Sequence, residues 1–332
     1  MGQTRREFLS SSVASLAAAA VANGSLAAAE RPTKDDISLA VWSINRSYYV
    51  SNKTTWPTCS NVAPRWRNLD LPRICREEFD INGLELVSYF FESAMQRYLQ
   101  EMKKAADSYG VRYVLIMISG EGDMCAKDKS ERMLAARAHR RWIDMGHYLG
   151  CHAIRCDLGG SREGWKEDKD LVKRAAESFN NLLEYAKEAN TNVILENHDG
   201  ASSDPDVVVS LMKTVNNPNF GTLPDFGNTN PGDNREEVLR RIVPWAKGIS
   251  VKASWSPDGK SSFDLEPLLR ICQESGYHGF YGIESSYGPR RAPGAAKAPP
   301  EQLSPDQLWE NELKGVKLTK AVLDRVILKK LA

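Results

Sequence analysis

Three carboxylates, Glu196, Asp225 and Glu284, each close a short apolar run of this chain and precede polar residues or glycine. Runs of this length and composition are typical of buried strands. Carboxylates at the ends of parallel strands come together at one edge of the sheet, where they repel one another strongly at low dielectric. Because a divalent cation is the simplest way to hold three such groups together, these residues predict a metal-centred site.

Eight short apolar runs supply the strands that must position these carboxylates. They comprise residues 37–43, 83–87, 111–118, 153–158 and 248–253, together with three runs that end at Glu196, Asp225 and Glu284. Segments with helical spacing alternate with them, at 71–79, 93–109, 130–149, 170–189, after the cap 203–205, and at 235–243, 265–275 and 306–331. Strict alternation gives a parallel sheet, and eight units favour closure into an α/β fold, a single-domain (β/α)8 TIM barrel.

The composition is that of a globular chain. The 332 residues are 42% hydrophobic and carry a net charge of +1, so there is no electrostatic case for binding nucleic acid or an anionic membrane surface. No Gly-x-Gly-x-x-Gly follows the first strand, which weakens a dinucleotide-binding interpretation. The six cysteines show no zinc spacing; Cys151 and Cys156 are expected to be buried thiols, and a disulfide from Cys59 stays open.

Residues 1–30 are predicted to be a twin-arginine signal peptide rather than part of the barrel, which would occupy 31–332. The segment Thr4-Arg-Arg-Glu-Phe-Leu resembles the twin-arginine motif, an Ala/Ser/Val-rich stretch follows, and three alanines at 27–29 offer a cleavage site. The stretch is too short and too weakly apolar for a stable membrane anchor. We therefore expect a periplasmic or secreted protein that uses the twin-arginine export machinery.

Five segments of the chain resemble the xylose-isomerase-like TIM barrels, often called the sugar phosphate isomerase/epimerase family. They are Gly83-Leu-Glu-Leu, Ile194-Leu-Glu-Asn-His-Asp-Gly, Asn219-Phe-Gly-Thr-Leu-Pro-Asp-Phe-Gly-Asn, Ile249-Ser-Val-Lys and Gly279-Phe-Tyr-Gly-Ile-Glu. The resemblance spans about residues 37–328. The combination is specific for the superfamily but not for one substrate.

The resemblance implies one divalent metal ion held by Glu196, Asp225 and Glu284. The family's fourth ligand is usually a histidine two residues before a lysine, but here Ser250 precedes Lys252, and Asn228 replaces a second family histidine. The metal would then have fewer protein ligands plus water, or His198 would join them. Oxygen ligands favour Mn²⁺ or Mg²⁺ over Zn²⁺.

The resemblance also implies a reaction that begins with loss of a proton beside a carbonyl. Glu196 and Glu284 would remove and return the proton, while Lys252 would add positive charge at the substrate oxygen. Trp42, Glu85, Arg155, His198 and Asn228 are the candidate substrate-binding residues. Each of four residues also has an alternative interpretation. Lys252 could lie on the surface, and Trp42 could pack in the core. His198 could be a hydrogen-bonded loop residue, and Glu85 could form a salt bridge with Arg155.

These observations predict an isomerase or epimerase that acts on a free sugar, a keto sugar or a glycoside. Elimination from a 3-keto-glycoside, by a lyase or hydratase, would use the same site. A barrel that binds carbohydrate without catalysis is a further possibility. Two loop tryptophans, Trp56 and Trp66, could stack on a sugar ring. Arg290 and Arg291 could bind an anionic group of the substrate. A DNA phosphodiesterase on the same barrel would need histidines that are absent here. The identity of the sugar and the oligomeric state stay open.

Overall fold

The computed structural model of the protein describes residues 33–48, 65–160, 164–230, 232–289 and 303–328. The predicted leader, Trp56, Cys59, Arg290 and Arg291 lie outside these residues. In the described part, no helix is both long and apolar enough to cross a membrane.

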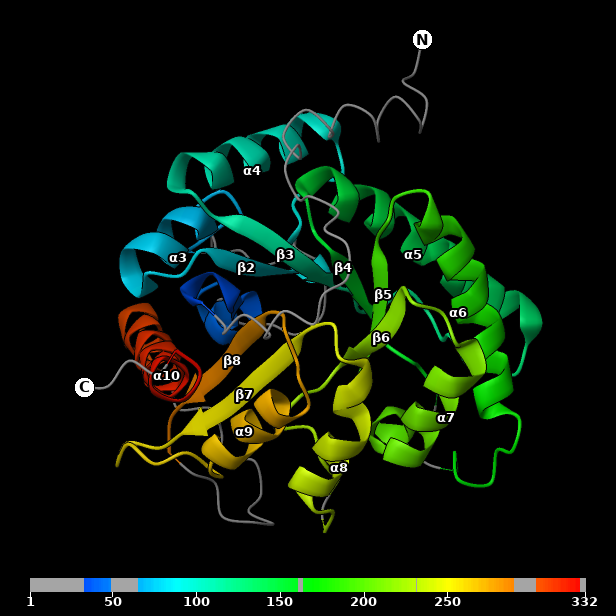
Figure 1. The fold of residues 1–332 in the computed structure, drawn as a ribbon. Coiled ribbons are helices and arrows are strands. Elements are labelled where there is room, and N and C mark those ends of the chain that lie inside the picture. The colour runs from blue at the N-terminus through cyan, green and yellow to red at the C-terminus, as the bar shows by residue number, and fades with distance from the viewer. Residues whose placement is uncertain (1–32, 49–64, 161–163, 231, 290–302, 329–332) are drawn as a thin grey trace, which may run out of the picture.

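Eight parallel strands form one sheet at the centre of the molecule (Figure 1), in the order β6-β5-β4-β3-β2-β1-β8-β7. Two isolated parallel bridges, Thr222 with Ala246 and Asp225 with Ser250, join the β6 edge to the β7 edge and close the sheet. The predicted TIM barrel is therefore confirmed. The strands are β1 (Ile37–Ala40), β2 (Gly83–Val87), β3 (Arg112–Met117), β4 (Ala153–Cys156), β5 (Asn192–Glu196), β6 (Phe220–Leu223), β7 (Ile249–Trp255) and β8 (Tyr281–Tyr287).

Helices surround the strands as an outer layer (Figure 1). The α-helices are α2 (Asn45–Tyr48), α3 (Leu71–Phe79), α4 (Gln96–Tyr109), α5 (Lys129–Leu149), α6 (Leu171–Lys187), α7 (Pro205–Val215), α8 (Arg235–Ile242), α9 (Glu266–Glu274) and α10 (Pro305–Val326). Short 3₁₀ turns complete the fold: η2 (Lys34–Asp36), η3 (Val41–Ile44), η4 (Ser88–Phe90), η5 (Gly200–Ser203) and η6 (Val243–Trp245). The predicted segments match these elements to within a few residues, with two exceptions. The predicted first strand, 37–43, ends at Ala40, because the chain turns into η3 at Val41, and β8 continues three residues beyond Glu284.

Side chains in the connecting loops explain where α7 and α8 begin. Asp204 accepts a hydrogen bond from the backbone amide of Asp206, and Pro205 occupies the first helical position, where its missing N–H costs nothing. Asn234 accepts from the amides of the first turn of α8. Because the helices run antiparallel to the strands, these helix starts lie at the same end of the barrel as the carboxyl ends of the strands.

Apolar side chains fill the space between the strands and the helical layer, and the five cysteines of the described residues are buried free thiols. The expectation for Cys151 and Cys156 is thereby confirmed. Because strand side chains alternate between the two faces, alternate residues of β7 and β8 turn to the barrel interior. Lys252 and Glu284 are register partners on these neighbouring strands, which places their side chains together.

Candidate active site

The three predicted carboxylates converge at the carboxyl end of the barrel. Glu196, Asp225 and Glu284 each offer an oxygen within 4.8 Å of the oxygens of the other two. Glu196 and Asp225 are only 3% and 4% exposed, and Glu284 is half-buried. The geometric prediction that these groups come close enough to share one ion is therefore met.

Arg155 and Asn228 hold the Glu196 carboxylate in place. The guanidinium of Arg155 donates from Nε and Nη2 to Oε2 at 2.6 and 2.5 Å, and the Asn228 amide donates to Oε1 at 2.9 Å. Burial alone would raise the pKa of Glu196, but the positive charges of Arg155 and Lys252 outweigh it and hold the pKa below its ordinary value. Glu196 is therefore a fixed negative charge.

Asp225 is oriented by backbone amides and by Ser250. Its Oδ1 accepts from the amides of Gly227 and Asn228 at 2.8 Å each, and its Oδ2 accepts from the Ser250 hydroxyl at 2.8 Å. Burial and the neighbouring carboxylates raise its pKa to about 8, although the Lys252 ammonium opposes them. Three hydrogen bonds therefore fix the orientation of the Asp225 side chain.

Lys252 bridges two of the carboxylates. Its Nζ lies 2.5 Å from Glu284 Oε1 and 3.6 Å from Asp225 Oδ2, and its side chain is 30% exposed. Burial disfavours the ammonium, but the carboxylates of Asp225 and Glu284 outweigh this effect and raise the pKa of Lys252. Of the two positions considered for Lys252, the barrel interior is the correct one.

A cavity of about 190 Å³ opens beside this ion pair, between the ends of β7 and β8, η3 and α10. Glu284, Lys252 and Trp42 line it. Trp42 also packs edge-on against Phe90, with ring centroids 5.5 Å apart, so its ring both closes the core and presents a surface to the cavity. A sugar ring in this cavity would meet the predicted catalytic pair.

Glu85 lies deeper in the barrel than the three carboxylates. It is completely buried, accepts a hydrogen bond from Ser38 at 2.6 Å, and fills the space beside Gly282, where an added Cβ would lie 2.2 Å from its Oε1. Burial raises the pKa of Glu85 to about 8, with a further contribution from Glu284. The salt bridge to Arg155 considered for Glu85 is wrong, because Arg155 binds Glu196 and Asp157 instead.

The remaining candidates lie at the rim. His198 is 44% exposed, and its Nδ1 is 3.6 Å from the Asp199 carboxylate, so it does not join the carboxylate group in the described structure. Trp66 packs edge-on against Trp309 of α10, with centroids 5.2 Å apart, so its ring anchors its loop to that helix.

Sequence reasoning missed Asn197, the buried residue directly after Glu196. Its Nδ2 donates to the backbone oxygens of Asp225 and Asn228 at 3.0 and 2.9 Å, and its Oδ1 accepts from the Asp225 amide at 2.7 Å. It therefore ties together the loops after β5 and β6. Its position next to a predicted ligand, inside one of the five segments that resemble the family, was the signal in the sequence.

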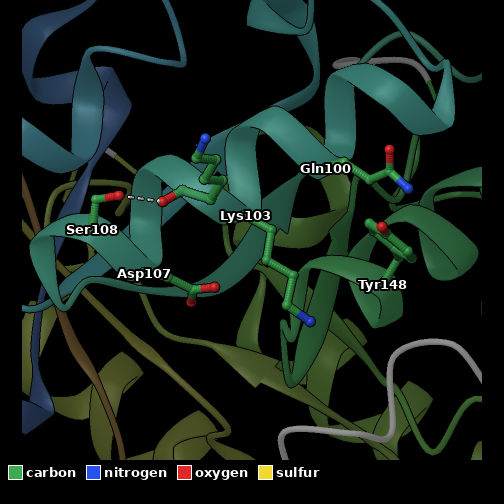
Figure 2. Close-up of a pocket in the computed structure, with 6 residues that line it drawn as sticks. Gln100, Lys103, Asp107, Ser108 and Tyr148 are labelled. Carbon is green, nitrogen blue, oxygen red and sulfur yellow. Dashed lines mark hydrogen bonds between the residues drawn. The ribbon is translucent and has the colours of Figure 1, made fainter.

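A hollow of about 500 Å³ lies on the outer helical layer, between α4 and α5. Figure 2 shows the residues that line it. Ser108 donates to the Lys104 carbonyl there at 2.8 Å, and the Lys103 ammonium lies 5.8 Å from the centre of the Tyr148 ring. These residues belong to the carboxyl-terminal parts of both helices, at the end of the barrel remote from the carboxylates. The hollow has no part in the candidate site.

The donor set fits a divalent cation. Three carboxylates with nearby oxygens form a hard, oxygen-only ligand set, which suits Mg²⁺ or Mn²⁺. Hydrogen bonds from Arg155, Asn228, Ser250 and the backbone already orient two of the carboxylates, as supporting residues do around metal ligands.

Three solved structures illustrate which proteins this chain resembles. One is 3-keto-D-glucoside 4-epimerase from E. coli (15% identity, 84% of this chain and 97% of that chain covered, TM-score 0.58). Another is D-psicose 3-epimerase in the presence of D-fructose (13% identity, 88% of this chain and 99% of that chain covered, TM-score 0.63). The third is a xylose isomerase-like TIM barrel protein from Mycobacterium smegmatis in complex with magnesium (15% identity, 77% of this chain and 89% of that chain covered, TM-score 0.54). At these identities the likeness shows the fold.

A comparison with curated proteins finds no match. A family model described as "Xylose isomerase-like TIM barrel" matches residues 77–312, which include all three carboxylates and Lys252. Together with the closed eight-stranded barrel, this match shows that the chain belongs to the xylose isomerase-like TIM barrel family.

Proposed function

We propose that this protein is a metal-dependent sugar isomerase or epimerase that removes a proton beside a carbonyl group of a free sugar, keto sugar or glycoside. The observation that carries the proposal is the Glu284–Lys252 pair, which faces a cavity beside a group of three converging carboxylates. Two of the similar solved structures are sugar epimerases, which supports this reaction class.

Glu284 is the better candidate for the proton-transferring group. Both Glu196 oxygens accept hydrogen bonds, and Arg155 keeps its pKa low, so Glu196 is a weak base held in one orientation. Glu284 lines the cavity, and Lys252 holds one of its oxygens. The Lys252 ammonium can also stabilise negative charge that develops on the substrate oxygen.

Glu196, Asp225 and Glu284 would hold the cation, with Mg²⁺ or Mn²⁺ favoured over Zn²⁺ by the oxygen-only ligands. A bound cation would act as a Lewis acid toward the substrate carbonyl. The similar barrel crystallised with magnesium supports this assignment. Metal analysis of the purified protein should show about one ion per chain, and Glu196→Gln and Glu284→Gln should each lower that content. Unchanged content in both variants would defeat the metal assignment.

Hydrogen exchange tests the reaction. Metal-loaded protein is incubated in deuterated water with a panel of ketoses and 3-keto-glycosides, and NMR follows the carbon next to the carbonyl. We expect deuterium uptake that Glu284→Gln abolishes and that the control Glu310→Gln, on the exposed face of α10, leaves intact. No exchange with any sugar would instead favour the non-catalytic carbohydrate-binding barrel.

The same assay separates isomerisation from elimination, because both begin with loss of the same proton. Deuterium in an intact sugar of changed configuration would indicate an epimerase. Release of the second ring from a 3-keto-glycoside would indicate a lyase or hydratase. The similarity to an epimerase of a 3-keto-glucoside makes this class of substrate the first to test.

We also propose that residues 1–30 direct twin-arginine export to the periplasm or the exterior. The support is the order of Arg5-Arg6, the small-residue stretch and the alanines at 27–29. Replacing both arginines by lysine should retain the full-length chain in the cytoplasm, and unchanged export would refute the proposal.

A further inference from the structure

Strand β8 carries Glu284 past the end of its neighbour β1. On one side, the register of β8 with β7 continues through Glu284 to Tyr287. On the other side, the pairing with β1 ends at Leu39 and Ile283, because the chain turns into η3 at Val41. The residues on both sides of Glu284 are buried, and a buried peptide group without a hydrogen-bond partner is costly. Another group must therefore replace β1 beside Glu284.

The hydroxyl group of Ser43 takes the place of the missing strand. It donates a hydrogen bond to the Ile283 carbonyl at 2.8 Å and accepts one from the Ser285 amide at 2.9 Å. One side chain can serve both groups because a hydroxyl is at once a donor and an acceptor. Ser43 is only 2% exposed, so these hydrogen bonds are shielded from water. Ser43 thus holds the residues directly before and after Glu284.

The segment that contains Ser43 has a second, separate anchor. The buried carboxylate of Glu312, on α10, accepts hydrogen bonds from two backbone amides of α2, at 2.7 and 3.1 Å. Trp42, which lines the cavity, lies in η3, between β1 and this anchor. Loss of the Ser43 hydroxyl should therefore disturb Glu284 and leave the Trp42 wall of the cavity in place.

Gly227 controls the position of the other member of the ion pair. It belongs to the loop after β6, and the Lys252 side chain lies directly against it. A Cβ added at Gly227 would lie 2.6 Å from Cδ and 3.0 Å from Cγ of Lys252, well inside van der Waals contact. Because these atoms are in the middle of the side chain, the lysine would make room only by moving away from this loop, which carries Asp225. The glycine thus allows Lys252 to bridge Asp225 and Glu284.

We propose that Ser43 and Gly227 are positioning residues for the Glu284–Lys252 pair. Ser43 fixes the carboxylate through the backbone of β8, and Gly227 fixes the ammonium by leaving room for the lysine side chain. Both act through the pair rather than on the substrate. This inference rests on the proposed function, in which Glu284 transfers the proton and Lys252 stabilises charge on the substrate oxygen.

Magnesium binding separates positioning from a general loss of structure, because the two residues should affect it in opposite directions. Ser43→Ala frees the backbone around Glu284, a proposed metal ligand, and should weaken magnesium binding about ten-fold. Gly227→Ala moves the Lys252 ammonium away from the carboxylates and should tighten magnesium binding about ten-fold, because the ammonium and the cation repel each other. Calorimetric titration of the full chain with magnesium measures both affinities.

Deuterium uptake by the sugar gives a second measurement. With metal-loaded protein and the first ketose or 3-keto-glycoside that the wild type exchanges, each variant should lower kcat about ten-fold and change KM by less than about two-fold. Two control variants lie toward the opposite end of the barrel and should match the wild type. Tyr113→Phe removes a buried hydroxyl that donates to the Met102 carbonyl at 3.0 Å, and Gly146→Ala adds a Cβ with no neighbour closer than 3.5 Å.

Circular dichroism of each variant shows whether it has folded. If Ser43→Ala does not fold, Ser43→Cys takes its place, since a thiol is close in size and forms only weak hydrogen bonds. If Gly227→Ala does not fold, adding Lys252→Ala should restore the fold, because the overlap is with that side chain. Persistent unfolding of the double variant would overturn the role of Gly227.

Unchanged magnesium affinity and kcat in Ser43→Ala would remove Ser43 from this role. Gly227 is removed if Gly227→Ala weakens magnesium binding or leaves both quantities unchanged. Failure of the proposed function looks different, because the wild type would exchange no sugar while the two variants still changed magnesium affinity in opposite directions. Conversely, exchange that both variants retain in full would keep the isomerase and overturn the inference. A wild type that neither binds magnesium nor exchanges any sugar would refute both.

Discussion

Replacing Glu85 by glutamine should change how stability depends on pH. The carboxyl group is completely buried, and burial raises its pKa from the ordinary 4.5 to about 8. Between these two values the folded chain binds more protons than the unfolded chain, so the free energy of unfolding falls as pH rises from about 4.5 to about 8. Each pKa unit corresponds to about 1.4 kcal/mol, so Glu85 accounts for at most about 5 kcal/mol of this loss.

Glutamine keeps the shape of the protonated carboxyl group and does not titrate. Its oxygen can still accept from Ser38, and its amide would occupy the position of Oε2, which has no hydrogen-bond partner in the structure. Any cost of that unpaired amide is the same at every pH. The Glu85→Gln variant should therefore gain stability relative to the wild type as pH rises, and exceed it at pH 9.

Urea denaturation at intervals from pH 5 to pH 9, with a chelator present, measures this difference. Subtracting the free energy of unfolding of the variant from that of the wild type at each pH isolates the contribution of Glu85. The contribution of Asp225, whose pKa is also raised, cancels because both proteins contain it. Glu184→Gln, on the exposed side of α6, is the control and should give a constant difference. If the difference between wild type and Glu85→Gln varies by less than about 0.5 kcal/mol over this range, the assignment of a buried, protonated Glu85 is refuted.

Three further predictions concern the packing around the site. Gly282→Ala should destabilise the fold by about 1–3 kcal/mol, because the new Cβ would overlap the Glu85 carboxyl group. In a double-mutant cycle, adding Glu85→Ala should recover part of that loss, and additive losses of stability would contradict the predicted overlap. Asn197→Ala removes three hydrogen bonds to the loop that carries Asp225. Calorimetry should show magnesium binding weakened about 10- to 100-fold. Unchanged magnesium affinity would show that Asn197 is not needed to position Asp225. Lys252→Met should abolish deuterium exchange while the fold persists by circular dichroism, and an active variant would remove the lysine from the mechanism.

Much of the barrel was predictable because its determinants are local. Buried parallel strands are short continuous apolar runs, and helix boundaries depend on neighbouring residues such as Asp204, Pro205 and Gly150, which act within one turn. The convergence of Glu196, Asp225 and Glu284 also follows from local information, since a residue at the carboxyl end of a parallel strand has only one edge at which to lie.

Partner choice among the charged groups was decided by the tertiary structure. The sequence places Glu85, Arg155 and Glu196 on three strands, and either glutamate could have been the partner of the arginine. The depth of each side chain in the barrel settles this choice, because Glu85 lies beside Gly282 in the interior while Glu196 lies at the mouth. Depth depends on the stagger between strands, which no single segment encodes.

By itself the sequence determined the fold class, the three-carboxylate site and the candidate lysine, because these depend on strand ends and on residue types within a few positions. Only the tertiary structure decided that Asn197 braces Asp225, that Glu196 is held by Arg155, and that Ser43 binds the residues on both sides of Glu284. Those contacts join loops far apart in the chain, and their geometry is set by how the barrel closes.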